Sequence, residues 1–189
     1  LSDFGSQVIQ SRVELIDELR PLVLAAYTDL APESGETSIE YRSFLGDDVG
    51  TSLETIKAGF YEAMASARKS ELERGMSLVG PHRDDVFLGL RSLPAKGYAS
   101  HGESWSVALA LRLASYEILR EDLRGGGDPV LILDDVFAEL DTSRRIQLMS
   151  ATQLAEQTFI TAAVESDLPK ELLTQKFYVT PGVVKKGKS

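Results

Sequence analysis

The chain has 189 residues, a formal net charge of −9 and a sequence pI of about 4.8, an acidic balance that argues against a free-standing basic nucleic-acid-binding domain. A mean hydropathy of −0.09, without any apolar run of bilayer-spanning length, argues against a membrane protein. The lack of cysteine excludes disulfides and thiolate metal sites, and we expect a cytoplasmic protein.

Residues 1–75 have the pattern of a helical lobe. Apolar residues recur at three- and four-residue steps over residues 1–31, which predicts a helix. Pro21 lies inside this pattern and marks either a kink or the start of a second helix. Alternating residues at 38–45 predict a short strand. The run Thr51-Ser52-Leu53-Glu54 reads as a capping box, with Thr51 as the N-cap of another long helix.

From Met76 onward the composition changes. The run Gly80-Pro81-His82-Arg83-Asp84-Asp85 predicts a turn, which leads into a strand at residues 86–90. Its charged residues are either exposed surface polarity or part of a site, and the residues alone leave both interpretations open. A hairpin-like connection at residues 91–97 follows.

The next motif lies at the start of a predicted helix that ends before the glycines at 125–127. Ser100 and Glu103 have the spacing of a capping box. Ser100 and the backbone amides near Gly102 and Glu103 would also suit an anion, because a helix N-terminus presents N–H groups and a positive dipole end. Taken by itself, this motif fits a helix cap and an anion site equally well.

An aliphatic run at residues 130–133, after Asp128-Pro129, predicts a strand buried on both faces of a parallel sheet. Asp134 and Asp135 follow it, at the strand end where ligands of such sheets bind. The pair either holds Mg²⁺ or forms a solvated acidic turn. Asp141 is expected to cap a helix that runs to residue 154.

The remaining elements predict an α/β fold with parallel strands. We expect a buried strand at 158–161, a short helix at 168–173 and a last strand at 177–179. The lysines at the C-terminal end are interpreted as a solubility tail. The Gly-Lys-Ser at 187–189 is not a phosphate-binding loop, since no helix follows it.

Taken together, three spaced motifs resemble the RecF family, bacterial DNA replication and repair ATPases of the ABC type. They are Gly80-Pro81-His82-Arg83-Asp84-Asp85, Ser100-x-Gly102-Glu103 with the alanine-rich helix after it, and the run at 134–141, Asp-Asp-Val-Phe-Ala-Glu-Leu-Asp. The resemblance implies that residues 76–189 are the C-terminal part of an ABC-type ATPase head, with flanking helices on a mostly parallel sheet. It implies that residues 1–75 are a helical arm lobe.

The resemblance also implies roles for single residues. Asp134 would hold Mg²⁺, and Asp135 would be catalytic by orienting or deprotonating the attacking water. Ser100, Gly102 and Glu103 would contact ATP held by a partner subunit, and Asp141 would lie at the dimer interface. In this chain Ser104-Trp105 replaces the Gln-Arg that usually follows, and Thr161-Ala162 stands where transporters carry a switch histidine.

No Gly-x-x-x-x-Gly-Lys-Ser/Thr loop opens a helix in this sequence. We therefore expect that loop on a segment before Leu1, and no ATPase activity from these 189 residues alone. By resemblance, the complete protein binds DNA at single-strand gaps, forms an ATP-dependent homodimer and slowly hydrolyses ATP. It acts with RecO and RecR to load RecA. The alternative is a non-catalytic ABC- or SMC-like dimerisation module.

Overall fold

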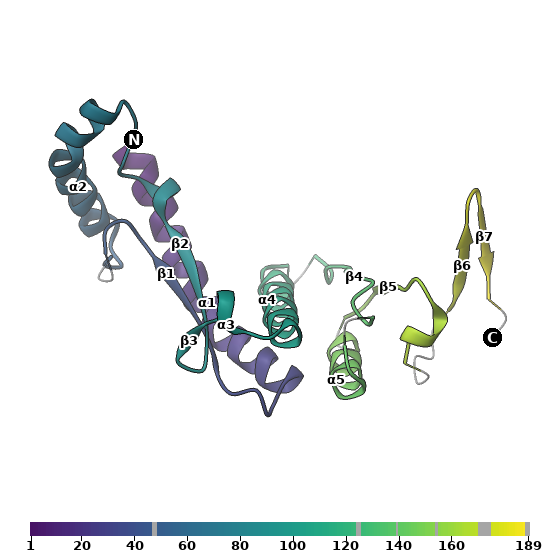
Figure 1. The fold of residues 1–189 in the computed structure, drawn as a ribbon. Coiled ribbons are helices and arrows are strands. Elements are labelled where there is room, and N and C mark those ends of the chain that lie inside the picture. Colours follow the sequence, from purple (N-terminus) through teal and green to yellow (C-terminus); the bar gives the residue numbers. More distant parts are fainter. Residues whose placement is uncertain (47–48, 124–125, 139, 154, 170–174, 188–189) are drawn as a thin grey trace. The chain divides into compact units, whose positions relative to one another are not determined.

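The structure, a computed structural model, describes residues 1–46, 49–123, 126–138, 140–153, 155–169 and 175–187. Two compact units divide the chain, Leu1–Gly127 and Asp128–Ser189. Figure 1 labels the helices and strands of both units. Both units contain helices and strands, and the predicted α/β class is confirmed.

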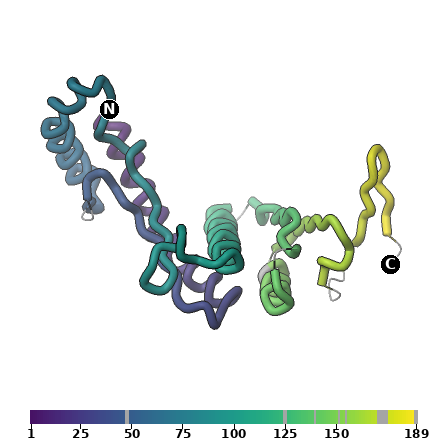
Figure 2. Tube along the Cα trace, in the orientation of Figure 1, coloured from purple at the N-terminus to yellow at the C-terminus, as the bar shows by residue number. Residues whose placement is uncertain are grey.

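A long helix, α1 (Ser2–Leu30), organises the first unit. It packs against α2 (Leu53–Arg74), α4 (His101–Asp122) and strand β1 (Thr37–Arg42). Figure 2 traces the path of these segments along the chain. Among the described helices, none is both long and apolar enough to cross a lipid bilayer.

Two apolar clusters follow one another along α1, as its helical period predicts. The first joins its N-terminal half to α2, through Ile9, Ile56, Phe60 and Val79. The second joins its C-terminal half to β1 and α4, through Ile16, Leu19, Val23, Ile39 and Ala114. The central helix therefore contributes to both parts of the core.

A three-stranded antiparallel sheet has the order β1 (Thr37–Arg42), β2 (Asp85–Leu90), β3 (Leu93–Pro94). A 3₁₀ turn, η1 (Pro81–Arg83), precedes β2, and the short helix α3 (Ala95–Tyr98) leads from β3 toward α4. The pairing of β1 with β2 crosses residue 75, where the sequence suggests a domain boundary. That boundary stays a prediction.

The structure decides between the two interpretations of Pro21 and corrects one N-cap. α1 continues through Pro21, so no second helix begins there. One missing backbone hydrogen bond is outweighed by packing, because Leu19 and Val23 on either side are buried. The N-cap of α2 is Ser52, whose hydroxyl accepts from the Thr55 amide at 3.1 Å, and the prediction of Thr51 is wrong by one residue.

The second unit begins with a βαβ arrangement. Strand β4 (Leu131–Asp134) pairs in parallel with β5 (Thr158–Thr161), and α5 (Thr142–Thr152) connects them. A parallel pair requires such a crossover connection. The predicted strands, the helix and the parallel pairing are confirmed, although residue 154 at the predicted helix end lies outside the described residues.

The expectation that β4 is buried on both faces is wrong. Leu133 is 5% exposed, whereas Ile132 on the opposite face is 65% exposed. Among the described residues, β4 belongs to a sheet of two strands only, and Phe159 of the neighbouring β5 is also exposed. An aliphatic run alone does not distinguish one covered face from two.

A β-hairpin closes the described chain, where β6 (Phe177–Thr180) pairs antiparallel with β7 (Val183–Lys186). β6 was predicted, but β7 was interpreted as a basic tail. The Pro181-Gly182 turn is the signal that would have predicted the second strand. A 3₁₀ turn, η2 (Glu165–Asp167), comes before this hairpin, and the helix predicted at 168–173 falls largely on residues outside the described ranges.

Candidate functional site

Ser100 forms a complete capping box at the start of α4. Its hydroxyl accepts a hydrogen bond from the Glu103 amide at 3.3 Å, and the Glu103 carboxylate accepts one from the Ser100 amide at 2.8 Å. The helix-cap interpretation is therefore confirmed. It does not exclude an anion site, since a hydroxyl that accepts a hydrogen bond keeps its own proton to donate. The predicted phosphate contacts of Ser100, Gly102 and Glu103 stay predictions.

Glu103 has a second partner that the sequence did not suggest. Arg91, in the turn between β2 and β3, donates from Nη2 to Glu103 Oε1. The Glu103 side chain is only 14% exposed, whereas that of Arg91 is 54% exposed. The Ser100 amide, the Ser100 hydroxyl and the Arg91 guanidinium lower the pKa of Glu103, because all three stabilise its charged form. The Arg91–Glu103 ion pair thus connects the start of α4 to the β2–β3 hairpin.

Two further residues of this segment have defined positions. Gly102 is half-buried in the first turn of α4. Trp105 is also half-buried and lies near the start of the same helix. Arg91 is the arginine that contacts the helix start here.

In the second unit, Asp134 and Asp135 lie at the carboxyl end of β4, and both are exposed. Thr161 is the register partner of Asp134 on β5, and its hydroxyl donates to Asp134 Oδ1. The Asp135 amide donates to the hydroxyl of Thr161 at 3.1 Å and to its carbonyl oxygen at 3.2 Å. The end of β5 therefore fixes both acidic residues.

Asp135 has a φ of 54°, in the left-handed region. Aspartate and asparagine occupy this region more readily than most other non-glycine residues. The chain turns away from the sheet at this residue, so Asp134 ends the strand and Asp135 begins the loop. The regular alternation of side chains along β4 therefore stops at Asp134.

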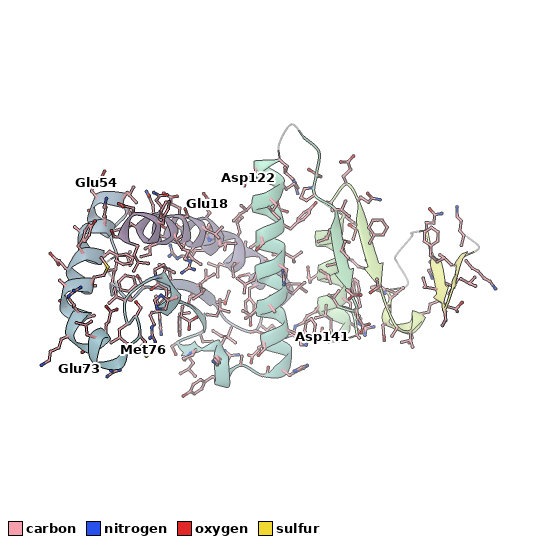
Figure 3. The ribbon with its side chains drawn as sticks, turned by 90° about the horizontal axis from the view of Figure 1, so that it is seen from above. Glu18, Glu54, Glu73, Met76, Asp122 and Asp141 are labelled. Carbon is pink, nitrogen blue, oxygen red and sulfur yellow. The ribbon has the colours of Figure 1, made fainter. Side chains whose placement is uncertain are left out.

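Asp141 lies before α5 and caps it (Figure 3). Its Oδ1 accepts from the Arg144 amide at 2.9 Å, and its other carboxylate oxygen lies 3.3 Å from Arg144 Nη1. The predicted cap is confirmed, and a position at a dimer interface stays a prediction. Glu139, in the same motif, is outside the described residues.

The turn at residues 80–85 contains a buried acidic residue. The Asp84 side chain is 0% exposed; Oδ1 accepts from the Phe44 amide at 2.7 Å, and Oδ2 accepts from the Tyr41 hydroxyl. Burial, then the hydrogen bond to Asp84, raises the pKa of Tyr41 to about 12. Asp84 thus fixes this turn to the end of β1, whereas His82 and Arg83 are exposed.

A cavity of about 320 Å³ lies beside this turn, and Arg12 lines it together with Tyr41 and Asp84. Arg12 Nη1 donates to the Pro81 carbonyl at 2.7 Å and lies 3.8 Å from Asp84 Oδ2. Sequence reasoning did not identify this network, because its members are far apart in the chain and meet only through the fold. The only sequence signal was the turn itself.

The acidic residues at the end of β4 fit a Mg²⁺–nucleotide site in which the protein supplies few of the metal ligands. Among them, no group of three or more His, Asp or Glu side chains could enclose a metal ion. Mg²⁺ needs no such group, because it commonly binds through one or two carboxylates together with water and phosphate oxygens. Asp134, exposed at a strand end, is a carboxylate of the kind that such a site would use. The structure brings Asp134 and Asp135 together, while Ser100, Gly102 and Glu103 belong to the other unit.

No protein-family model matches the chain. The DNA replication and repair protein RecF of Beutenbergia cavernae is 50% identical over 97% of this chain, which covers 51% of that protein. RecF of Streptomyces avermitilis is 47% identical over 98% of this chain and 49% of its own length. The chain thus spans about half the length of the curated relatives it matches.

Two solved structures have the same fold. One, titled as the recombination mediator protein RecF with ATP in the RecFOR pathway, matches all of this chain and 48% of that chain, with a TM-score of 0.81 and 26% identity. The other, titled as the same mediator protein with ATPrS, has a TM-score of 0.79 and 24% identity over 98% of this chain and 48% of its own.

Proposed function

Because this chain belongs to the RecF family and spans about half of the length of its relatives, we propose that it is part of an ATP-dependent DNA repair protein. The single observation that carries the proposal is the pair Asp134 and Asp135 at the carboxyl end of a parallel strand, in a chain about 50% identical to RecF. Ligands of parallel sheets bind at that edge.

In the proposed site Asp134 holds Mg²⁺, which would neutralise phosphate charge when bound. Asp135 orients the attacking water and accepts its proton. Ser100, Gly102 and Glu103 contact ATP bound by a second subunit, at the N-terminus of α4 where amides and dipole favour an anion. Asp141 lies at the interface of the two subunits. We expect the 189 residues alone to be inactive, since the proposed site lacks its phosphate-binding loop.

The proposed DNA partner is a gapped duplex with its single-stranded region, and the proposed protein partners are a second copy, RecR and RecO, acting before RecA. The protein named RecF in the solved structures is titled a recombination mediator of the RecFOR pathway, which supports this assignment. The net charge of −9 requires that contacts to DNA phosphates be local. We propose a cytoplasmic location, where such DNA would be found.

The role of Asp135 is tested by Asp135→Asn in the complete protein. Asparagine tolerates the positive φ at this position, so the turn is kept while the proton acceptor is lost. We expect ATP binding within a few-fold of the parent and a loss of hydrolysis of at least about 100-fold. The ATP-bound dimer should accumulate.

The matched control is Asp128→Asn, an exposed position before the other end of β4. Both variants are compared with the parent by nucleotide-binding titration, steady-state hydrolysis and sedimentation with ATP. Hydrolysis at the parental rate in Asp135→Asn would remove the proposed role. A parent that dimerises but hydrolyses no ATP would instead favour the non-catalytic module.

A further inference from the structure

Within the described part of the chain, the Thr161 side chain forms hydrogen bonds with both acidic residues at the end of β4. It is the last residue of β5 and the register partner of Asp134. Its hydroxyl donates to Asp134 Oδ1 and accepts from the Asp135 amide at 3.1 Å. The contact joins residues 27 positions apart in sequence, so it exists only because β4 and β5 pair in parallel.

The direction of these hydrogen bonds follows from the groups involved. The Asp135 amide can only donate, so the Thr161 oxygen accepts there. The single hydroxyl proton is then directed to Asp134, where the ionised carboxylate accepts it. One carboxylate oxygen is thereby fixed to the neighbouring strand, and the plane of the carboxylate is set. The carboxylate can no longer rotate freely about its terminal bond.

We propose that Thr161 is a positioning residue that orients the Asp134 carboxylate toward a divalent cation. The inference rests on the proposed function, because it takes Asp134 as the cation ligand. Ligands of metal ions generally depend on such hydrogen-bond partners, whose removal lowers affinity or activity by about 10- to 100-fold.

The backbone geometry allows the effect of Thr161 on the Asp134 carboxylate to be separated from its contribution to the fold. Asp135 also donates to the carbonyl oxygen of Thr161, at 3.2 Å. That backbone hydrogen bond remains when the side chain is changed, so the turn at Asp135 keeps one of its two contacts. Removal of the hydroxyl therefore removes the hydrogen bond from Thr161 to the Asp134 carboxylate, while Asp135 stays hydrogen-bonded to the backbone of β5.

The substitutions are chosen by shape. Thr161→Val has nearly the same shape and also favours strands, but it cannot donate to Asp134. Thr161→Ser keeps the hydroxyl and loses only a methyl group. Thr158→Val is the matched control, since Thr158 is at the other end of β5 and its hydroxyl donates to the Thr152 carbonyl at 3.3 Å.

The experiment measures how tightly Mn²⁺, used in place of Mg²⁺, binds to the complete protein in the presence of ATP. Binding is followed by the loss of the electron paramagnetic resonance signal of the free ion. We expect Thr161→Val to weaken Mn²⁺ binding by about 10- to 100-fold. Thr161→Ser should stay within about three-fold of the parent, as should Thr158→Val. Melting temperatures of all three are recorded without nucleotide, and Thr161→Ala serves as a second hydroxyl-free variant if Thr161→Val does not fold.

Parental Mn²⁺ affinity in a folded Thr161→Val or Thr161→Ala protein would overturn the positioning role and leave the proposed function intact. Loss of affinity in Thr161→Ser as large as in Thr161→Val would also overturn it, because the hydroxyl would then not be the cause. A parent protein that binds ATP without retaining Mn²⁺ would instead contradict the proposed function, and the role of Thr161 with it.

Discussion

At the scale of single residues, three groups stabilise the ionised form of Glu103: the Ser100 amide, the Ser100 hydroxyl and the Arg91 guanidinium. Its pKa is lowered from the ordinary 4.5 on folding. The stabilisation is therefore fully present above pH 4.5, and it is lost as pH falls through the lower pKa of the folded state.

We predict that Glu103→Gln lowers the melting temperature at pH 7 and that the difference from the parent shrinks below pH 4.5, where the parental carboxylate takes up its proton. The control is Glu62→Gln, an exposed position in the middle of α2. Thermal unfolding between pH 3 and 8 checks the prediction. A difference in melting temperature that does not change with pH would show that glutamine destabilises the fold through altered packing and not through the lost charge.

The cap at Ser100 was predictable because its four residues are consecutive and the hydrogen bonds are local. The same rule was wrong by one residue at Ser52, since Thr51 and Ser52 both carry suitable hydroxyls. The contacts of Arg91 with Glu103 and of Tyr41 with Asp84 were not predictable, because both depend on strand pairing that no short pattern encodes.

At the scale of elements, α1 and α2 approach closely at Gly5. A Cβ atom on Gly5 would lie 2.5 Å from Phe60 Cε2, and the Phe60 ring is fully buried. In contrast, a Cβ on Gly59 of α2 would lie 3.6 Å from Leu45 Cδ2, an ordinary contact. The two helical glycines therefore differ in the space beside them.

We predict that Gly5→Ala lowers the free energy of unfolding, because an overpacking cost of about 1–3 kcal/mol exceeds a helix gain of about 0.5–1 kcal/mol. Gly59→Ala should raise it by about 0.5–1 kcal/mol. Urea unfolding of the two variants beside the parent measures both. Equal stabilisation by the two substitutions would mean that α1 and α2 are less closely packed at Gly5.

Most elements could be predicted from periodicity alone, including α1, α2, α4 and the parallel pair β4–β5. The burial of β4 could not, since an aliphatic run gives no information about how many strands or helices cover it. Strand β7 was not predicted, because Lys185 and Lys186 resemble a basic tail unless the turn before them is considered.

At the scale of the whole molecule, the first compact unit is Leu1–Gly127, so it contains both sides of residue 75, where the sequence predicts a domain boundary. β2 supplies the hydrogen-bond partner of β1, and α4 covers the second apolar cluster of α1. A fragment that stops at residue 75 would expose an unpaired strand edge and this cluster.

We predict that residues 1–127 unfold cooperatively as an isolated fragment, whereas residues 1–75 do not. Circular dichroism during thermal unfolding distinguishes the two, with hydrogen exchange of the β1 amides as a second measurement. Cooperative unfolding of residues 1–75 would support the boundary suggested by the sequence.

Trp105 is the only tryptophan in this chain, and it is half-buried near the start of α4, five residues after Ser100. Indole emission depends on the polarity around the ring. Because these 189 residues contain a single tryptophan, selectively excited tryptophan fluorescence comes from this position alone. The wavelength of that emission consequently records the state of the segment around the Ser100 cap, without any label. This segment of the chain thus carries its own internal fluorophore.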